Sequence, residues 1–441
     1  MNVFTLQDFI RNGYVILKPD FPDELHQIIH RKTQLAVKNG NPGNKIFEQI
    51  PELHKIFDHV EIRRTLSQIV GANYIMHPHR HCHVNPPNSN GQELHQDGTP
   101  RQFSGWNHPW RRHHHLRLAM AFYYPHDVSE TMGGTSIIPS SQYYNNRHSK
   151  DDRVEFKIVG SPGTIAIVHY DIWHRATINS TNSPRYMMKF LFQRCTEPSL
   201  KKINDSQKPP LFDRSVDEYH WHWFHRRQKN FCNETNLSLN HSTKSLIEKL
   251  SEDSRSIVQT KSIYHLAQIG GEAVGQLMDA LQNGHSEIHR LNIATALSSI
   301  GKSSVSGLED VVRFSGDWWL RATAIDTLGD IGELENDSIL LLVESLSDDS
   351  AWVRRNAAYA LGTVAPKDSE ALPELILSTK DEHSFVRINA LKSLIRIYRS
   401  TKQSGRDYSE IITAYQNALK DQDNRVVEYA RQYLKLIEQQ F

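Results

Sequence analysis

Cysteine, net charge and long apolar runs are all scarce in this chain of 441 residues. The three cysteines, Cys82, Cys195 and Cys232, stand at spacings that form neither a metal motif nor a redox motif, and one of them must remain unpaired. Such usage is typical of a reducing compartment. The formal net charge is only +1, which argues against a general binder of nucleic acid or acidic membranes.

The chain also lacks any stretch that is long and apolar enough to span a bilayer. Its first residues show no basic region ahead of an apolar run, so we see no targeting segment. We therefore expect a cytoplasmic protein with no membrane partner and no nucleic-acid partner. The length predicts two or three domains, and an apolar content of 38% is enough for ordinary cores.

The strongest chemical signal is the stretch Glu93-Leu-His-Gln-Asp-Gly98. On an extended strand, His95 and Asp97 share one face, so both can point at the same centre. His174, much further along the chain, offers a third ligand. Two histidines and one carboxylate on one face of a metal are the ligand set of non-haem Fe(II) oxygenases. Arg185, eleven residues after His174, carries a guanidinium suited to bidentate binding of a carboxylate.

A single His-x-Asp pair is a weak signal in a chain with 25 histidines, and the order of the whole set is what adds weight. With this set the chain resembles the phytanoyl-CoA dioxygenase family of Fe(II)- and 2-oxoglutarate-dependent oxygenases. The matching residues are Leu94 to Gly98, Gly133 to Gln142, Gly163, His174, Asn179 and Arg185, and Phe9 to Leu17 is similar to the family's opening. The resemblance covers roughly residues 1–230 and says almost nothing about substrate.

The resemblance implies a double-stranded β-helix, a jelly-roll or cupin-like barrel with flanking helices. It implies that His95, Asp97 and His174 hold Fe(II), that 2-oxoglutarate takes two further positions on the metal, and that O2 takes the last. Arg185 would bind the distal carboxylate of 2-oxoglutarate. Related halogenases lack the metal-binding carboxylate, so Asp97 favours hydroxylation, although desaturation, ring closure and epimerisation remain open.

Four more residues are candidates for contacts with the bound molecules. Asn85 stands ten residues before His95, where the family often contacts 2-oxoglutarate, although a basic residue is common there. Tyr123 ends an expected strand in the region that lines the family's co-substrate pocket. Trp106 and Trp110 lie in an expected flap, where they either pack on substrate or anchor the flap.

Four histidines alternate along one expected strand: His77, His79, His81 and His83. In a regular strand they share a face. They can form a second metal site, a polar wall of the active site, or a hydrogen-bonded or solvated surface. A zinc hydrolase built on this face is an alternative, but no carboxylate general base stands at a recognisable spacing.

Periodicity predicts the elements around these motifs. Helices are expected at residues 5–11, at 23–37 and within 51–70. Strands are expected at residues 14–17, 74–84, 116–124, 135–138, 164–169 and 186–193.

The sequence changes character from Leu246 onward, where similar segments recur. Their equivalent positions are 259, 290, 321, 354, 387 and 427, so the spacing is nearly constant over five copies and longer before the sixth. A regular period of this size indicates a helical solenoid, and the pattern from Asp348 to Leu361 resembles short HEAT repeats. The expected organisation is α+β followed by all-α: a dioxygenase domain at 1–235, a linker at 236–245 and a HEAT-like solenoid at 246–441.

Three functions remain open at this point. The first is an oxygenase that hydroxylates an unactivated C–H bond of a small metabolite or natural product, or of a peptide bound along the solenoid. The second is a non-catalytic binding scaffold, and the third is a different metal enzyme. The solenoid would bind a partner, present substrate, mediate self-association or support the barrel.

Overall fold

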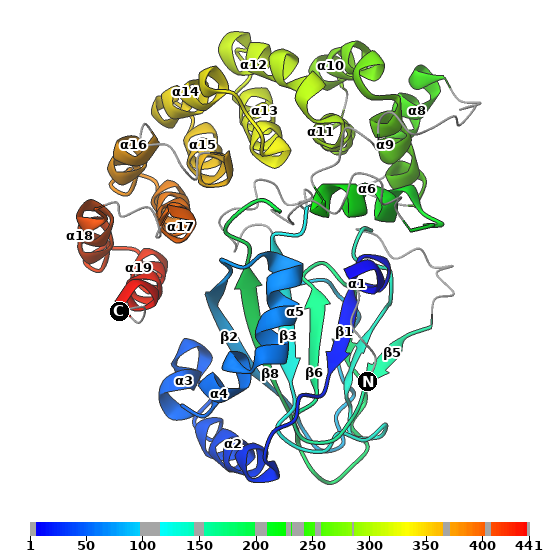
Figure 1. Cartoon of the computed structure of the whole chain (residues 1–441), viewed down its shortest axis with the longest axis vertical. Coiled ribbons are helices and arrows are strands. Elements are labelled where there is room, and N and C mark those ends of the chain that lie inside the picture. Colours follow the sequence, from blue (N-terminus) through cyan, green and yellow to red (C-terminus); the bar gives the residue numbers. More distant parts are fainter. Residues whose placement is uncertain are drawn as a thin grey trace. The chain divides into compact units, whose positions relative to one another are not determined.

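Largely apolar strands build two antiparallel sheets in the N-terminal half of the chain (Figure 1), and the central strands β3, β6 and β8 are buried on both faces. The larger sheet has the strand order β1-β6-β3-β8-β2, and the smaller has the order β5-β4-β7. The strands are β1 (Tyr14–Leu17), β2 (Ile75–Asn85), β3 (Leu118–Tyr123), β4 (Thr135–Ile137), β5 (Phe156–Ile158), β6 (Ile165–His169), β7 (His174–Ala176) and β8 (Arg185–Gln193).

This computed structural model describes residues 6–97, 115–144, 154–198, 210–225, 231, 242–251, 257–284, 286–364, 371–401 and 407–438. Contacts divide these residues into two units. The first unit draws on Met1–Asp97, Leu116–Tyr143 and Ser149–Arg194, and the second takes the rest. From Cys195 onward the chain belongs to the second unit. The linker expected at 236–245 lies partly outside the described residues and stays a prediction.

Helices of the first unit supply apolar partners for one face of the large sheet. They are α1 (Leu6–Asn12), α2 (Asp23–Ala36), the 3-10 turn η1 (Gly43–Lys45), α3 (Ile46–Gln49), α4 (Leu53–Asp58) and α5 (Val60–Val70). Phe57 of α4 meets Phe190 and Phe192 of β8, with ring centroids 4.5 and 5.5 Å apart. Because side chains alternate along a strand, Arg185, Met187 and Lys189 lie on the opposite face of β8.

The helices and strands predicted from the sequence in this unit are confirmed, with boundaries that move by one or two residues. The strands β5 and β7 were not expected. Each has three residues, so at most two side chains share a face, and that is too few to show an alternation.

The regular alternation expected for the four histidines of β2 holds only in part. His81, His83 and Asn85 pair with Lys189, Met187 and Arg185 of β8, so they share a face with those residues. The pairing shifts between His77 and Arg80, and the ladder at His79 is irregular. A bulge of this kind cannot be read from the residue types alone.

The second unit is helical. It contains α6 (Ser215–Phe224), α8 (Thr243–Lys249), α9 (Ile257–Ile269), η2 (Gly270–Ala273), α10 (Val274–Asn283), α11 (Glu287–Ile300), η3 (Lys302–Ser304), α12 (Val305–Phe314), α13 (Trp318–Ile331), α14 (Asn336–Glu344), η4 (Ser345–Ser347), α15 (Ala351–Val364), α16 (Ala371–Ser378), α17 (Ser384–Thr401), α18 (Ser409–Ala418) and α19 (Asn424–Glu438). Each predicted repeat corresponds to one helix of a row in which α9, α11, α13, α15, α17 and α19 pack in series. The predicted helical solenoid is thereby confirmed.

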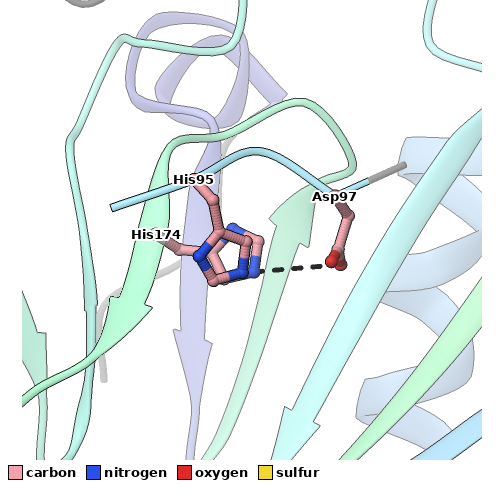
Figure 2. A group of neighbouring side chains, drawn as sticks. All are labelled: His95, Asp97 and His174. Carbon is pink, nitrogen blue, oxygen red and sulfur yellow. Dashed lines mark ion pairs between the residues drawn. The ribbon is translucent and has the colours of Figure 1, made fainter. Parts of the chain in front are cut away.

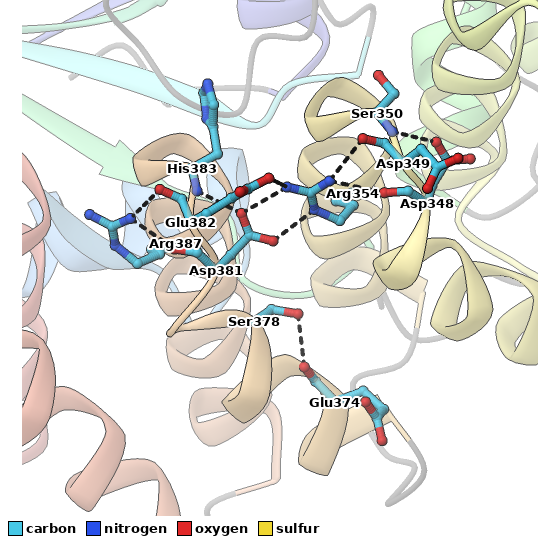
Figure 3. Close-up of polar contacts among 10 residues, drawn as sticks. All are labelled: Asp348, Asp349, Ser350, Arg354, Glu374, Ser378, Asp381, Glu382, His383 and Arg387. Carbon is cyan, nitrogen blue, oxygen red and sulfur yellow. Dashed lines mark hydrogen bonds and ion pairs between the residues drawn. The ribbon is translucent and has the colours of Figure 1, made fainter.

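Arginines at the position that recurs in the sequence connect neighbouring repeats, as Arg354 does in Figure 3. Arg321 pairs with Asp348, Arg354 with Asp381, and Arg387 with Asp421, at 2.8, 2.7 and 2.7 Å. Arg354 Nη1 also donates to the backbone carbonyls of Asp348 and Asp349 at 2.9 and 3.2 Å. Each arginine therefore joins the loop before its own helix to the loop of the next repeat.

Asparagines two residues after the recurring position connect each repeat to the one before it. The side-chain amides of Asn292, Asn356 and Asn389 donate to Leu250 O, Ala322 O and Arg355 O of the preceding repeat, at 2.9, 2.9 and 3.1 Å. A polar side chain recurs in a buried row because a carbonyl of the preceding repeat accepts from it. Among the described residues, no helix has both the length and the apolar character needed to cross a membrane.

We predict that Arg354→Ala destabilises the solenoid by about 3 kcal/mol, because the change removes a buried guanidinium and leaves the Asp381 carboxylate, whose side chain is 11% exposed, without its partner. Arg354→Lys keeps the charge but not the bidentate geometry, and should give an intermediate loss. Urea unfolding measures both. The control is Arg425→Ala, which removes an exposed arginine paired with nearby Asp423 and should cost less than about 1 kcal/mol. Equal losses for Arg354→Ala and Arg425→Ala would contradict the role given to this ladder.

Candidate functional site

Two backbone hydrogen bonds bring His95 and His174 together, although the two residues are far apart in the sequence. The His95 N–H donates to His174 O at 3.0 Å, and the His174 N–H donates to His95 O at 2.9 Å. Their rings lie with centroids 4.6 Å apart. Residues that exchange both bonds in an antiparallel pair project to the same side, so β7 and the segment before Asp97 position both imidazoles together (Figure 2).

Each imidazole is oriented by a carbonyl two residues upstream. His95 Nδ1 donates to Glu93 O at 2.8 Å, and His174 Nδ1 donates to Ile172 O at 2.9 Å. A proton held on Nδ1 leaves the lone pair on Nε2, which is the state that binds a metal. His174 Nε2 lies 3.8 Å from Asp97 Oδ2, and one ligand atom from each of the three residues falls within 4.8 Å of the others.

The third residue, Asp97, is held ionised. Lys189 Nζ donates to Asp97 Oδ2 at 2.8 Å. Burial would raise the pKa of Asp97, but Lys189, His174 and His95 lower it to about 2. Burial lowers the pKa of His174 to about 4, against the opposing effect of Asp97. At neutral pH the site therefore offers a carboxylate and a neutral His174 imidazole, which are the forms that bind a metal ion.

A cavity of about 200 Å³ opens beside these residues. Its lining includes His95, His174, Thr135, and the paired strands β2 and β8. Their register sets out three successive cross-strand pairs: Asn85 with Arg185, His83 with Met187, and His81 with Lys189. Arg185 and Lys189 are four residues apart on one face, so about 13 Å of strand separates them.

Arg185 is a buried charged group of this cavity whose hydrogen bonding is incomplete among the described residues. It is 1% exposed. Its Nε donates to Gly133 O at 3.0 Å, while Nη1 has no hydrogen-bond partner among the described residues. The buried hydroxyl of Thr135 also lacks one there. A buried guanidinium edge and a hydroxyl in one cavity fit the distal carboxylate of 2-oxoglutarate, which would supply the missing acceptors.

Asn85 lines the cavity, but its side chain is committed to the scaffold. Its amide donates to Gly133 O at 3.0 Å and to Thr177 O at 2.9 Å, and its carbonyl oxygen accepts from the Ser89 hydroxyl. Gly133 O therefore accepts from both Asn85 and Arg185. This arrangement orients the arginine, and the predicted contact of Asn85 with 2-oxoglutarate stays a prediction.

The structure does not bring Tyr123 to the cavity. Its hydroxyl bonds to His26 Nδ1 of α2 at 2.7 Å, on the helix side of the large sheet. The next residue, Tyr124, lies nearer the predicted co-substrate end, because the backbone N–H of Thr135 donates to its hydroxyl at 3.3 Å. The choice of Tyr123 was made from its place at the end of the strand, and the register that turns it toward His26 could not be read from the sequence.

Three histidines of β2, His79, His81 and His83, lie near enough to Asp97 and Lys189 to feel their charges. His83 lines the cavity. Burial lowers the pKa of all three, to about 4 for His79 and about 2 for His83. Within the described ranges, the only group of residues arranged to hold a metal ion is His95, Asp97 and His174, so no second site is formed there.

Sequence reasoning gave no role to two residues of the cavity, Thr135 and Lys189. Lys189 interrupts the apolar run from Met187 to Phe192, and a lysine inside a buried strand is rare unless it is paired. The sequence therefore carried a signal that Lys189 is paired, but it did not show that Asp97 is the partner. Trp106 and Trp110 lie outside the described residues, so their predicted role in a flap is not addressed.

Two protein families match the chain. The phytanoyl-CoA dioxygenase (PhyH) family matches residues 11–187, which contain every residue of the candidate metal group. The HEAT repeat family matches residues 305–395 and 339–435, within the helical solenoid. The comparison with curated proteins gave no match.

Solved structures similar to this chain share little sequence with it. The non-haem α-ketoglutarate-dependent epimerase SnoN from nogalamycin biosynthesis has 13% identity and a TM-score of 0.36, over 46% of this chain and 88% of its own. The enzyme EctD from S. alaskensis, solved with bound Fe, has 15% identity and a TM-score of 0.35, over 50% and 82%. Likeness at this level does not bear on substrate.

We predict that only glycine is tolerated at position 133, beside Arg185, without a large loss of stability. Its φ is +75°, and an added Cβ would lie 2.2 Å from Asn85 Nδ2 and 2.7 Å from Thr177 O. Gly133→Ala should therefore lower the free energy of unfolding by about 3 kcal/mol or more, through backbone strain and overpacking. Gly40→Ala is the matched control, because Gly40 has a φ of +101° but no atom near the added Cβ. It should cost about 1 kcal/mol. Thermal unfolding compares the two, and similar losses would show that space around Gly133 is not limiting.

Proposed function

We propose that the chain is an Fe(II)- and 2-oxoglutarate-dependent oxygenase that hydroxylates an unactivated C–H bond of a small molecule. Residues 11–187 match the phytanoyl-CoA dioxygenase family, and HEAT repeats follow them in the chain. The proposal assigns the metal to His95, Asp97 and His174, and the distal carboxylate of 2-oxoglutarate to Arg185. One observation carries it: the two histidines of the metal-binding group line the same cavity as a buried guanidinium whose bonding is incomplete among the described residues.

The three proposed ligands suit Fe(II) by type and by protonation. Two Nε2 atoms and one carboxylate oxygen form a two-histidine, one-carboxylate set that leaves further positions open on a metal. When bound there, iron and 2-oxoglutarate would supply the oxidising chemistry, with O2 as oxidant and succinate and CO2 as the products of the co-substrate. The protein supplies orientation, charge and exclusion of water.

Particular side chains and carbonyls of the site provide this orientation and charge. The carbonyls of Glu93 and Ile172 keep both imidazoles in the tautomer with a free Nε2. Lys189 keeps Asp97 ionised. Arg185 and the Thr135 hydroxyl would donate to the distal carboxylate of 2-oxoglutarate. Arg185, Thr135 and Asn85 are themselves buried, and the lower polarity around them strengthens these charged contacts.

The arrangement of the sheets supports the predicted jelly-roll. The two sheets have five and three strands in antiparallel order, and isolated bridges connect Ser89 and Met132 to Asn179, and His95 to His174. We propose that the two sheets face each other as a double-stranded β-helix, with the metal-binding group between them. Side chains from both inner faces would then meet at the cavity.

The size of the cavity supports a small substrate, or a small part of a larger one. About 200 Å³ is below the usual range of pockets for drug-sized ligands, about 300–1,000 Å³. We assign the HEAT repeats to a protein partner. Trp318 and Trp352 are 44% and 41% exposed and stack with ring centroids 6.3 Å apart. Exposed tryptophans on a solenoid are suited to anchoring a partner.

The first test is the binding of Fe(II) and 2-oxoglutarate to the full chain without oxygen. The visible charge-transfer band of the chelate should appear in the wild type and be lost in His174→Ala, with metal affinity reduced more than about 100-fold. Asp97→Ala should behave alike. His54→Ala, which removes an exposed histidine, is the control and should leave the band unchanged. If the wild type gives no band, or if His174→Ala keeps it, the assignment of these ligands is wrong.

The second test addresses Arg185. Arg185→Ala should weaken 2-oxoglutarate binding about 30-fold, because a charge-assisted bond of about 2 kcal/mol is lost, while metal binding is retained. Arg175→Ala is the matched control, since Arg175 lies on β7 but pairs with Glu155 at 2.9 Å. An unchanged KM for 2-oxoglutarate in Arg185→Ala would remove Arg185 from this role.

A further inference from the structure

Lys189 carries a charge in a place where an apolar residue would complete the strand. It lies on β8 between Met188 and Phe190, and it is 6% exposed. Its ammonium has three donors, but Asp97 is the one acceptor that the described residues place within its reach. The same carboxylate oxygen is the one nearest to His174 Nε2, so Lys189 and a bound metal would share a single anion.

The pairing of β2 with β8 places this ammonium at the end of the cavity away from Arg185. Arg185 and Asn85 form one cross-strand pair, Met187 and His83 the next, and Lys189 and His81 the third. The first pair belongs to the proposed 2-oxoglutarate end. The third pair stands beside Asp97, where the metal would be. Lys189 therefore lies on the far side of the metal from the co-substrate anchor.

The charges of the described cavity do not balance in the proposed complex. An Fe(II) ion and the 2-oxoglutarate dianion cancel one another. Asp97 cancels one of the two buried cations, Arg185 and Lys189, and one positive charge remains. The lowered pKa values of His79 and His83 keep these imidazoles neutral, so they add no charge. A buried excess charge is costly unless an anion accompanies it.

We infer that Lys189, flanked by His81 and His83, forms an oxyanion-binding end of the active-site cavity, and that the substrate carries a carboxylate or phosphate group close to the carbon that is oxidised. This inference rests on the proposed function. The Lys189 ammonium supplies charge and donors toward the substrate anion. The imidazole of His81, directly across from Lys189, and that of His83, across from Met187, supply hydrogen-bond partners at the same face of β2, where their ring centroids lie 4.3 Å apart.

The arrangement also orients the substrate. One end is anchored at Lys189, next to Asp97, so the carbon nearest the anion is held close to the metal-binding group. A neutral molecule of the same shape would leave the ammonium with Asp97 alone. Discrimination of this kind is strong, because a site built for a charged partner leaves its own buried charge unpaired when that partner is absent.

The inference is tested on the full chain loaded with Mn(II) and 2-oxoglutarate, where the paramagnetic ion reports what binds near it. Electron paramagnetic resonance of Mn(II) first establishes loading. The probes are ¹³C-acetate, inorganic phosphate and ¹³C-acetamide, which is the neutral analogue of acetate, and the readout is nuclear relaxation. We expect Mn(II) to relax acetate, phosphate or both far more than acetamide, and the responding anion identifies the group.

The decisive variants are Lys189→Met and Lys189→Arg. Lys189→Met should bind Mn(II) and 2-oxoglutarate but lower the relaxation of the anion about tenfold, to the level of acetamide, as a charge-assisted bond is lost. Lys189→Arg should keep most of it. Lys157→Met, which removes a half-exposed lysine of β5 paired with Glu130, is the control and should behave as the wild type.

Three results would overturn the inference. Equal relaxation of acetate and acetamide in the wild type would show that charge is not recognised. Unchanged anion relaxation in Lys189→Met would mean that the anion binds the metal directly. Loss of Mn(II) from Lys189→Met would mean that Lys189 acts only by holding Asp97. Failure of the wild type to bind Mn(II) and 2-oxoglutarate is a separate result, which would overturn the proposed function and this inference with it.

Discussion

The site depends on one short piece of backbone pairing. His95 and His174 exchange two hydrogen bonds, and this isolated bridge brings a loop residue to the first residue of β7. Without the bridge, no local preference would hold the two imidazoles together, because they are distant in the sequence. The carbonyls that orient both rings belong to the same two segments. Position and tautomer therefore have a common origin in the backbone.

The pairing of β2 with β8 extends this constraint along the cavity. Arg185, Met187 and Lys189 share a face of β8, and their partners on β2 are Asn85, His83 and His81. A slip of one residue would turn all of them toward the helices. The opposite face prevents such a slip, because Phe190 and Phe192 pack on Phe57 of α4. Apolar packing behind the sheet thus stabilises the polar arrangement in front of it.

In the solenoid, the sequence pattern predicts the helices but not the contacts between them. The recurring arginines at 321, 354 and 387 are visible in the sequence, and the repeat period predicts stacked helices. The pattern cannot show that each guanidinium joins its own loop to the aspartate of the next repeat. A buried charge repeated at this spacing implies a partner in the adjacent unit, because a lone buried charge would be too costly.

The sequence by itself determined the classes of structure and the chemistry. Alternation and repeat period indicated the strands and the solenoid, and His95, Asp97, His174 and Arg185 were predicted as site residues from residue type, order and the family resemblance. Tertiary structure decided which neighbours these residues meet. It turned Tyr123 toward His26, committed Asn85 to the scaffold, and paired Lys189 with Asp97. The physical reason is that residue type and periodicity are local properties, whereas contacts between distant strands depend on register and bulges, which only the folded chain specifies.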